Sequence, residues 1–245
     1  MNPELRGFWG MPHPQGLDRY RQLLDNPSIT SLKWTKCYYN YGLEKRGYLH
    51  LFDPSLTGGK IAGDITPGYS TLRETGVRYA RDVVGSETPI FFIIRNPVER
   101  SWSAAKMIFR YRNTPITEKT LPSLIDLLGQ PIIRAYCDYS KALRFWGKYF
   151  RHVHVLSYND LCNEPNVFLE QIANIINIVN NWNETILRQK VWSDKNNMVI
   201  PNKVRAFLND EYMNEINDLA TVVDKSLINS WQDDPQHLKP IVPVG

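Results

Sequence analysis

The sequence predicts an α/β fold of three layers, in which a mainly parallel sheet is flanked by helices. Two short runs, Ile90–Ile94 and Val153–Leu156, are apolar at almost every position, which is typical of strands buried in a parallel sheet. Segments with apolar residues at helical spacing alternate with these runs, as in strand–helix–strand units. Pro97 follows the first run closely and suits the first turn of a helix.

The first third of the chain is expected to supply three strands and one helix. In chain order these are a strand over Leu5–Met11, a helix carrying Leu17, Tyr20, Leu23 and Leu24 that ends at Asn26-Pro27, a strand over Ser31–Tyr39, and a short strand over Lys60–Asp64 after Gly58-Gly59.

The remainder predicts two further strands and four helices. In order they are the strand Ile90–Ile94, a helix from Pro97, a helix over Tyr139–Phe150, the strand Val153–Leu156, a helix over Phe168–Val179, an irregular polar stretch over Arg188–Pro201, and a last helix over Lys203–Val223. Trp102 and Trp146 fall at helical positions that indicate core residues.

Length and composition favour one folded domain, over residues 1–245, that binds small anionic ligands. The 29 basic and 25 acidic residues give a net charge of +4, too small an excess to indicate a nucleic-acid partner. No apolar stretch approaches the length of a membrane span, so we expect a cytoplasmic protein without a membrane partner. The three cysteines are far apart in the sequence, which indicates neither a disulfide framework nor a metal site.

The junction after Ile90–Ile94 is the strongest candidate for a binding site. In parallel sheets, ligands bind beyond the carboxyl ends of strands, where helix N-termini offer free N–H groups to anions. Arg95 lies directly at such an end and could bind a phosphate bidentately, while Ser103 falls on the first turns of the next helix. The residues alone leave an alternative open: Arg95 pairs with a nearby carboxylate, and Ser103 caps the helix or faces solvent.

The string FFIIRNPVERSWS resembles the 3′-phosphate-binding segment of sulfotransferases that use PAPS (3′-phosphoadenosine 5′-phosphosulfate). The resemblance implies that Arg95 and Ser103 hold the 3′-phosphate, on a P-loop-like sulfotransferase fold. The segments Gly63–Tyr69, Tyr139–Trp146 and Val153–Leu161 are similar to other motifs of the carbohydrate and bacterial members, in the same order. The resemblance extends over about residues 10 to 231.

The chain departs from this family in the loop that surrounds the 5′-phosphosulfate. The family pattern G-x-x-K-x-G-T-T aligns with Gly10–Leu17, which places His13 at the lysine position and Gly16-Leu17 at the two threonines. The resemblance implies His13 as a catalytic residue whose charge depends on pH, unlike that of lysine. A solvent-exposed loop histidine is the alternative. The donor-binding residues of this loop would be Pro14, Gln15, Gly16, Leu17 and Asp18.

A general base is also missing from its family position, since Trp34–Tyr39 contains no carboxylate. Asp64 is the nearest candidate base and Glu44 is another, although a salt bridge or a solvated position explains each of them as well. The stretch from Lys190 to Pro201 is similar to the family's C-terminal loop over the donor, so Trp192 and Lys195 are candidate donor contacts.

The resemblance therefore implies transfer of a sulfonate group from PAPS to a hydroxyl or amine, with PAP as the product and no metal. The acceptor is expected to be a carbohydrate or a small metabolite. A sulfotransferase-like protein that binds nucleotide or a partner without transfer is the alternative, because His13 and Gly16-Leu17 replace the family's lysine and threonines. A nucleotide kinase is favoured less than either of these hypotheses, because no G-x-x-x-x-G-K-[ST] loop occurs in the sequence.

Overall fold

The computed structural model describes residues 45–179, 187 and 198–231. The chain divides into two compact units, residues 1–86 and 87–245. The described part is mostly helical and contains one parallel pair of strands, so the prediction of a mixed α/β fold is confirmed at that level.

Helices alone make up the regular structure described in the first unit. They are α4 (Lys45–His50), α5 (Pro54–Thr57), the 3₁₀ helix η1 (Pro67–Thr71) and α6 (Glu74–Val84). α4 and α6 contact each other. α6 ends at Gly85, whose φ of 86° lies in the region that glycine adopts without strain. The periodicity that we read from the sequence did not include α6.

The predicted strand over Lys60–Asp64 is wrong, because these residues form irregular and exposed backbone. Gly58 and Gly59 both take positive φ, 64° and 74°, and turn the chain after α5. No strand in the described residues pairs with this segment, and the side chains of Ile61 and Ile65 are 64% and 94% exposed. A segment of five residues without a partner strand does not form a strand.

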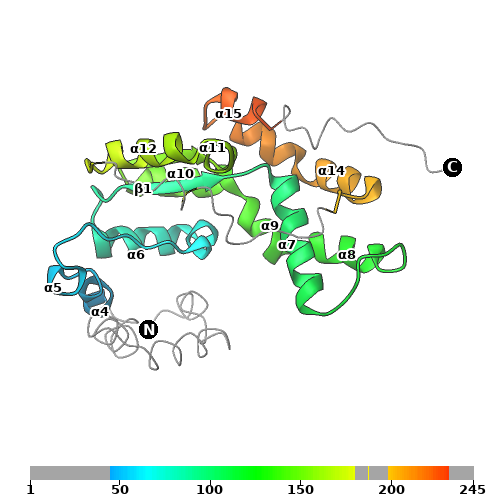
Figure 1. Cartoon of the computed structure of the whole chain (residues 1–245), viewed down its shortest axis with the longest axis horizontal. Coiled ribbons are helices and arrows are strands. Elements are labelled where there is room, and N and C mark those ends of the chain that lie inside the picture. Colours follow the sequence, from blue (N-terminus) through cyan, green and yellow to red (C-terminus); the bar gives the residue numbers. More distant parts are fainter. Residues whose placement is uncertain (1–44, 180–186, 188–197, 232–245) are drawn as a thin grey trace. The chain divides into compact units, whose positions relative to one another are not determined.

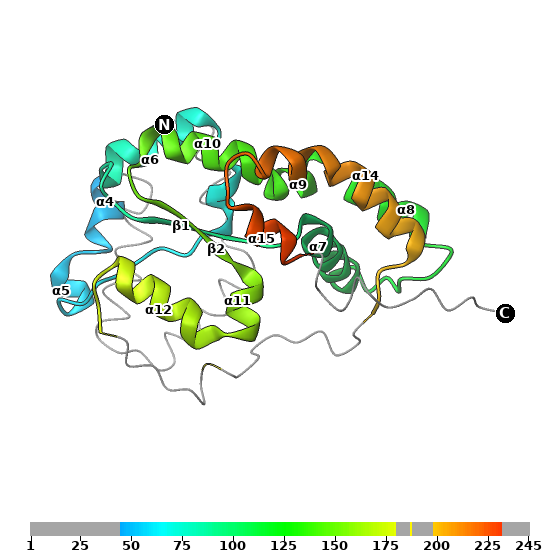
Figure 2. The same ribbon diagram turned by 90° about the horizontal axis from the view of Figure 1, so that it is seen from above.

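The second unit contains the parallel pair, β1 (Ile90–Ile94) and β2 (Val153–Ser157), which lie side by side in Figure 2. Their register aligns the first residues of both strands and also the last. Phe92 meets Trp146 of α10 edge to face, with ring centroids 5.9 Å apart, so α10 covers one face of the pair. The other face leaves Ile93 45% exposed, so the expected burial holds for one face only.

Helices supply the rest of the regular structure described in this unit (Figure 1). They are α7 (Pro97–Tyr111), α8 (Leu121–Leu128), α9 (Pro131–Arg134), η2 (Ala135–Cys137), α10 (Tyr139–Tyr149), α11 (Tyr158–Asn163), α12 (Pro165–Ile175), α14 (Asn202–Leu219) and α15 (Lys225–Asn229).

The four predicted helices of this region are present as α7, α10, α12 and α14, but two of them end early. α12 ends at Ile175 instead of Val179, and Asn177 shortly beyond it takes a positive φ of 53° that no helix continues through. α14 ends at Leu219, four residues before the predicted end. The shorter helices α8, α9, α11 and α15 were not predicted.

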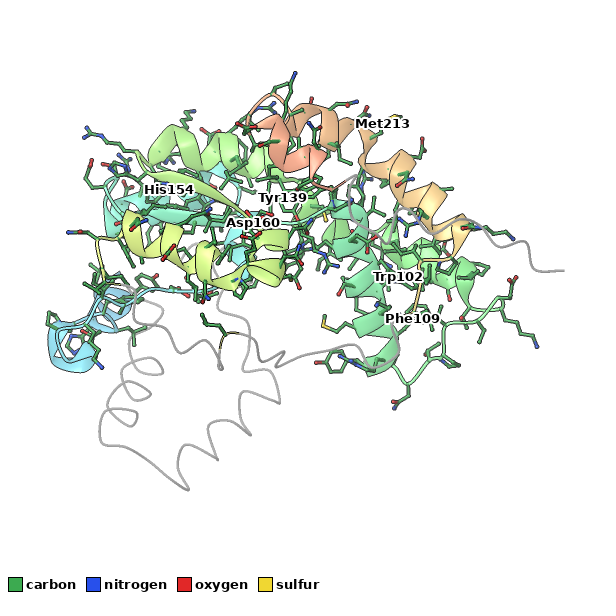
Figure 3. The ribbon with its side chains drawn as sticks, turned by 45° about the horizontal axis from the view of Figure 1, so that its top comes forward. Trp102, Phe109, Tyr139, His154, Asp160 and Met213 are labelled. Carbon is green, nitrogen blue, oxygen red and sulfur yellow. The ribbon has the colours of Figure 1, made fainter. Side chains whose placement is uncertain are left out.

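The core of the second unit lies where α7, α8, α9 and α14 pack together. α7 contributes Val98, Trp102, Ala105 and Phe109, which share one helix face, and two of them are labelled in Figure 3. Burial of each large apolar side chain stabilises the fold by roughly 1.5–3 kcal/mol. Trp102 and Trp146 are 3% and 5% exposed, which confirms the prediction that both are core residues.

None of the helices in the described ranges has the length and apolar character that a membrane crossing requires.

Candidate functional site

The site is built on the junction between β1 and α7. β1 ends at Ile94, opposite the last residue of β2, so both strands deliver their following residues to one edge. Asn96 begins α7 as its N-cap, and its side-chain oxygen accepts a hydrogen bond of 2.9 Å from the N–H of Val98. Pro97 occupies the first helical position, as predicted. The chain therefore turns sharply from strand to helix immediately after Arg95.

Arg95 lies half-buried at this edge and rests on an aromatic ring. Its guanidinium carbon is 4.8 Å from the centroid of Tyr158, the first residue of α11 after β2. The backbone of Arg95 lies close to the hydroxyl of Tyr139 and acts to lower its pKa. No carboxylate within the described ranges lies at ion-pair distance from Arg95. The pairing with a nearby carboxylate, which the residues alone left open, is thus not found in this part of the chain.

The hydroxyl of Tyr139 lies within electrostatic range of both Arg95 and Arg100. Burial raises the pKa of its hydroxyl above the ordinary value of 10.0, while the positive charges of Arg100 and Arg95 act in the opposite direction. The net shift is upward, so Tyr139 stays protonated at neutral pH. Figure 3 labels Tyr139 at the start of α10.

Ser103 is exposed in the second turn of α7, where the sequence placed it. It lies six residues after Pro97, which corresponds to about 9 Å along the helix axis. Its hydroxyl makes no hydrogen bond to the described residues.

Arg100 is a residue that our sequence reasoning missed. Its guanidinium carbon is 4.8 Å from the ring centroid of Tyr136, and one of its terminal nitrogens donates to the Cys137 sulfur at 3.9 Å. It precedes Ser103 by three residues, so both share a helix face, and this spacing is the signal that could have found it.

Asp64, in the first unit, is the acceptor of three hydroxyl groups. The hydroxyl of Tyr48 donates to it at 3.1 Å and that of Thr66 at 2.7 Å, and Tyr69 makes a further short hydrogen bond. Burial of Tyr48 and the negative charge of Asp64 raise the Tyr48 pKa to about 12. The salt bridge that we considered for Asp64 is not found among the described residues; the carboxylate instead links α4, through Tyr48, to η1, through Tyr69.

Several predicted site residues lie outside the described residues. These are His13, Pro14, Gln15, Gly16, Leu17, Asp18, Glu44, Trp192 and Lys195, together with the expected strands over Leu5–Met11 and Ser31–Tyr39.

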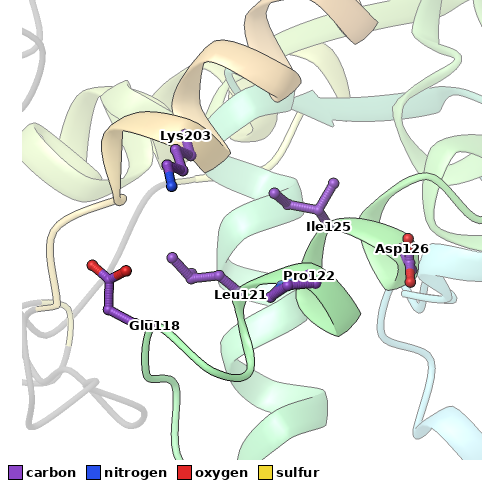
Figure 4. Close-up of a pocket in the computed structure, with 6 residues that line it drawn as sticks. All are labelled: Glu118, Leu121, Pro122, Ile125, Asp126 and Lys203. Carbon is purple, nitrogen blue, oxygen red and sulfur yellow. The ribbon is translucent and has the colours of Figure 1, made fainter.

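No group of three or more histidine, cysteine or acidic side chains gathers as metal ligands within the part of the chain that the structure describes. A surface pocket of about 330 Å³ lies between α8 and the start of α14 (Figure 4). Three apolar and three charged residues line it: Leu121, Pro122, Ile125, Glu118, Asp126 and Lys203. None of these is a predicted site residue.

A comparison of the chain with models of known protein families finds no match, and a comparison with curated proteins finds none either.

Proposed function

We propose that the chain is a sulfotransferase that transfers a sulfonate group from PAPS to a hydroxyl or amine of a carbohydrate or small metabolite. Arg95 and Ser103 hold the 3′-phosphate of the donor. The observation that carries this proposal is the placement of Arg95, which directly follows a parallel strand, lies over the ring of Tyr158, and has no carboxylate partner in the described ranges.

Several further features support a phosphate at this edge. The contact with the Tyr158 ring restricts the Arg95 side chain, and a guanidinium has the forked N–H groups that bidentate phosphate binding requires. α7 directs its N-terminus to the same edge, and the helix dipole favours negative charge there. The exposed Ser103 hydroxyl adds a neutral donor. The residues present therefore fit a phosphate group of the donor.

The parallel pair with helices that begin at both strand ends is compatible with the wider three-layer sulfotransferase fold. The strand that the sequence pattern predicted over Lys60–Asp64 is irregular backbone here. Among the described elements, the proposed fold is therefore supported by β1, β2, α7, α10 and α11.

Catalysis by such a site relies mainly on positioning and charge stabilisation. Arg95 and Ser103 anchor the donor, and the loop over residues 13–18 with His13 surrounds the transferred group in this proposal. Asp64 is proposed to have a structural function rather than that of a general base, because three hydroxyl donors already bind the carboxylate.

The test is calorimetric titration of the full chain with PAP, the product of sulfonate transfer. A charge-assisted hydrogen bond is worth about 1.5–3 kcal/mol, so Arg95→Ala is expected to weaken binding at least about tenfold. Arg151→Ala is the matched control, because Arg151 precedes β2 at the opposite end and pairs with Glu87 at 3.1 Å. An unchanged affinity in Arg95→Ala, or no binding by the wild type, would contradict the proposal.

A second candidate is a sulfotransferase-like protein that binds nucleotide without transfer. The specific observation in its favour is the replacement of the family's lysine and threonines by His13 and Gly16-Leu17. Transfer of radiolabelled sulfonate from PAPS to a mixed pool of sugars and hydroxylated metabolites separates the two candidates. PAP binding without any labelled product supports the second one.

A further inference from the structure

Two arginines near the carboxyl end of β1 have tyrosine rings rather than carboxylates as neighbours. The guanidinium carbon of Arg95 lies over the ring of Tyr158 and that of Arg100 over the ring of Tyr136, each 4.8 Å from the ring centroid. Within the described ranges, neither arginine has an acidic group at ion-pair distance. This shared arrangement distinguishes them from arginines that form ion pairs between helices.

A contact with an aromatic ring leaves the hydrogen-bonding capacity of a guanidinium largely unused. The negative face of a tyrosine ring attracts the cation electrostatically, whereas a carboxylate partner would accept hydrogen bonds from its N–H groups. One terminal nitrogen of Arg100 makes a weak contact of 3.9 Å with the Cys137 sulfur. Within the described residues, most N–H donors of the two side chains therefore have no acceptor.

Both arginines belong to the same end of α7. Arg95 directly precedes its N-cap, Asn96, and Arg100 is the fourth residue of the helix. The positive charges of both also act to lower the pKa of the Tyr139 hydroxyl against the effect of burial. Two like charges in a partly buried region repel each other, and an anion between them removes that repulsion. Ser103, which is exposed, follows Arg100 by three residues, so the half-buried Arg100 and Ser103 are neighbours on one side of α7.

We propose that Arg100 is a second anion-binding residue of the candidate site, so that the phosphate group held by Arg95 is contacted by two guanidinium groups. This inference rests on the proposed function for the identity of the ligand as PAP. The presence of a two-arginine phosphate site does not depend on it.

Chemical modification tests the site itself. Phenylglyoxal modifies accessible arginines, and peptide mass spectrometry reads the extent at each position. Inorganic phosphate is the probe, and it is expected to protect Arg95 and Arg100 together, while Arg110 and Arg151 react equally with and without it. Protection of Arg95 without Arg100, or of neither residue, overturns the inference.

Affinity measurements then test the contact with the nucleotide. Arg100→Ala is expected to weaken PAP binding at least about fivefold, and to leave binding of adenosine 5′-monophosphate, which lacks the 3′-phosphate, unchanged. Arg100→Lys keeps the positive charge but not the planar guanidinium, so its affinity for PAP is expected to lie between those of the wild type and Arg100→Ala. Arg110→Ala, farther along the same helix, is the control. Equal losses for both nucleotides would overturn the contact.

The two measurements separate the two proposals. Joint protection of both arginines by phosphate without PAP binding supports the two-arginine site and contradicts the proposed function. PAP binding that depends on Arg95 and is unaffected by Arg100→Ala supports the proposed function and contradicts this inference. Unfolding of each variant in urea accompanies both tests, because a lost packing contact with Tyr136 would lower stability instead.

Discussion

The carboxyl edge of β1 and the interface of α7, α9 and α14 use arginine in opposite ways. At the interface, Arg134 lies 2.5 Å from Glu211, and Arg205 lies 3.6 Å from Glu99. At the edge, Arg95 and Arg100 rest on aromatic rings. Neighbouring residues of α7, Glu99 and Arg100, thus belong to different environments. An arginine paired with a carboxylate stabilises the fold, whereas a stacked arginine keeps donors for a ligand.

The largest expected effect is a loss of protein stability when an ion-paired arginine of the interface is replaced. Glu99 is 4% exposed, and its Oε1 atom has no hydrogen-bond partner, so Arg205 provides its charge compensation in the described residues. Arg205→Met leaves this carboxylate buried without the cation and is expected to lower the free energy of unfolding by about 3 kcal/mol. Urea denaturation measures the change, and PAP affinity should stay at the wild-type value.

Glu99→Gln is the matched control for this prediction. The amide has nearly the same shape as the carboxylate but carries no charge, so Glu99→Gln removes the ion pair without leaving a buried charge unpaired. It is expected to lower the free energy of unfolding less than Arg205→Met does. A loss of PAP affinity in Arg205→Met at unchanged stability would break the comparison, because it would place a paired arginine in the binding site.

A smaller effect is expected from the ring beneath Arg95. A cation–π contact at a partly exposed position is worth about 0.5–1 kcal/mol, so Tyr158→Leu is expected to weaken PAP binding about two- to fivefold. Tyr158→Phe keeps the ring and is expected to bind PAP like the wild type. Equal losses in both variants would assign the effect to the hydroxyl group and not to stacking. Titration calorimetry measures all three proteins.

The smallest effect concerns Glu215, a carboxylate without a cation at ion-pair distance in the described ranges. It accepts hydrogen bonds from the Ser140 N–H at 2.7 Å and the Ser140 hydroxyl at 2.8 Å. Burial raises its pKa above 4.5, more than these bonds lower it. The contribution of Glu215 to stability is therefore present below pH 4.5 and is lost as the pH rises through the raised value.

Urea unfolding of the wild type and Glu215→Gln between about pH 4 and pH 7 tests this prediction. The free energy of unfolding of the wild type, relative to the variant, is expected to fall as the pH rises. A constant or rising difference would mean that a positive charge compensates Glu215, as Arg205 does for Glu99.

The sequence was sufficient for the elements whose local pattern agrees with their packing. The apolar run Ile90–Ile94 predicted β1, and the four long helices of the second unit have the expected positions. Lys60–Asp64 failed because strand formation depends on a partner strand that no local pattern specifies. α8 escaped prediction although it supplies four core leucines, since its eight residues are too few for a clear period.

The candidate site was predictable in part for a similar reason. The position of Arg95 follows from the strand that precedes it, and the position of Ser103 follows from helix geometry. The stacking partners could not be predicted, because Tyr158 and Tyr136 come from segments far along the chain that folding brings to this edge. The use of Asp64 as an acceptor of hydroxyls likewise depends on Tyr48, 16 residues away.

Because β1 and β2 end at register partners, their lengths are constrained during evolution. Arg95 and Tyr158 each follow the last residue of a strand, and those last residues are register partners. Deletion of one residue from either strand would draw the following side chain back by about 3.3 Å and turn it to the opposite face. Substitutions within the strands keep the arginine and the ring in contact, whereas single insertions or deletions separate them. The strand lengths are therefore expected to vary less than the amino acids within them.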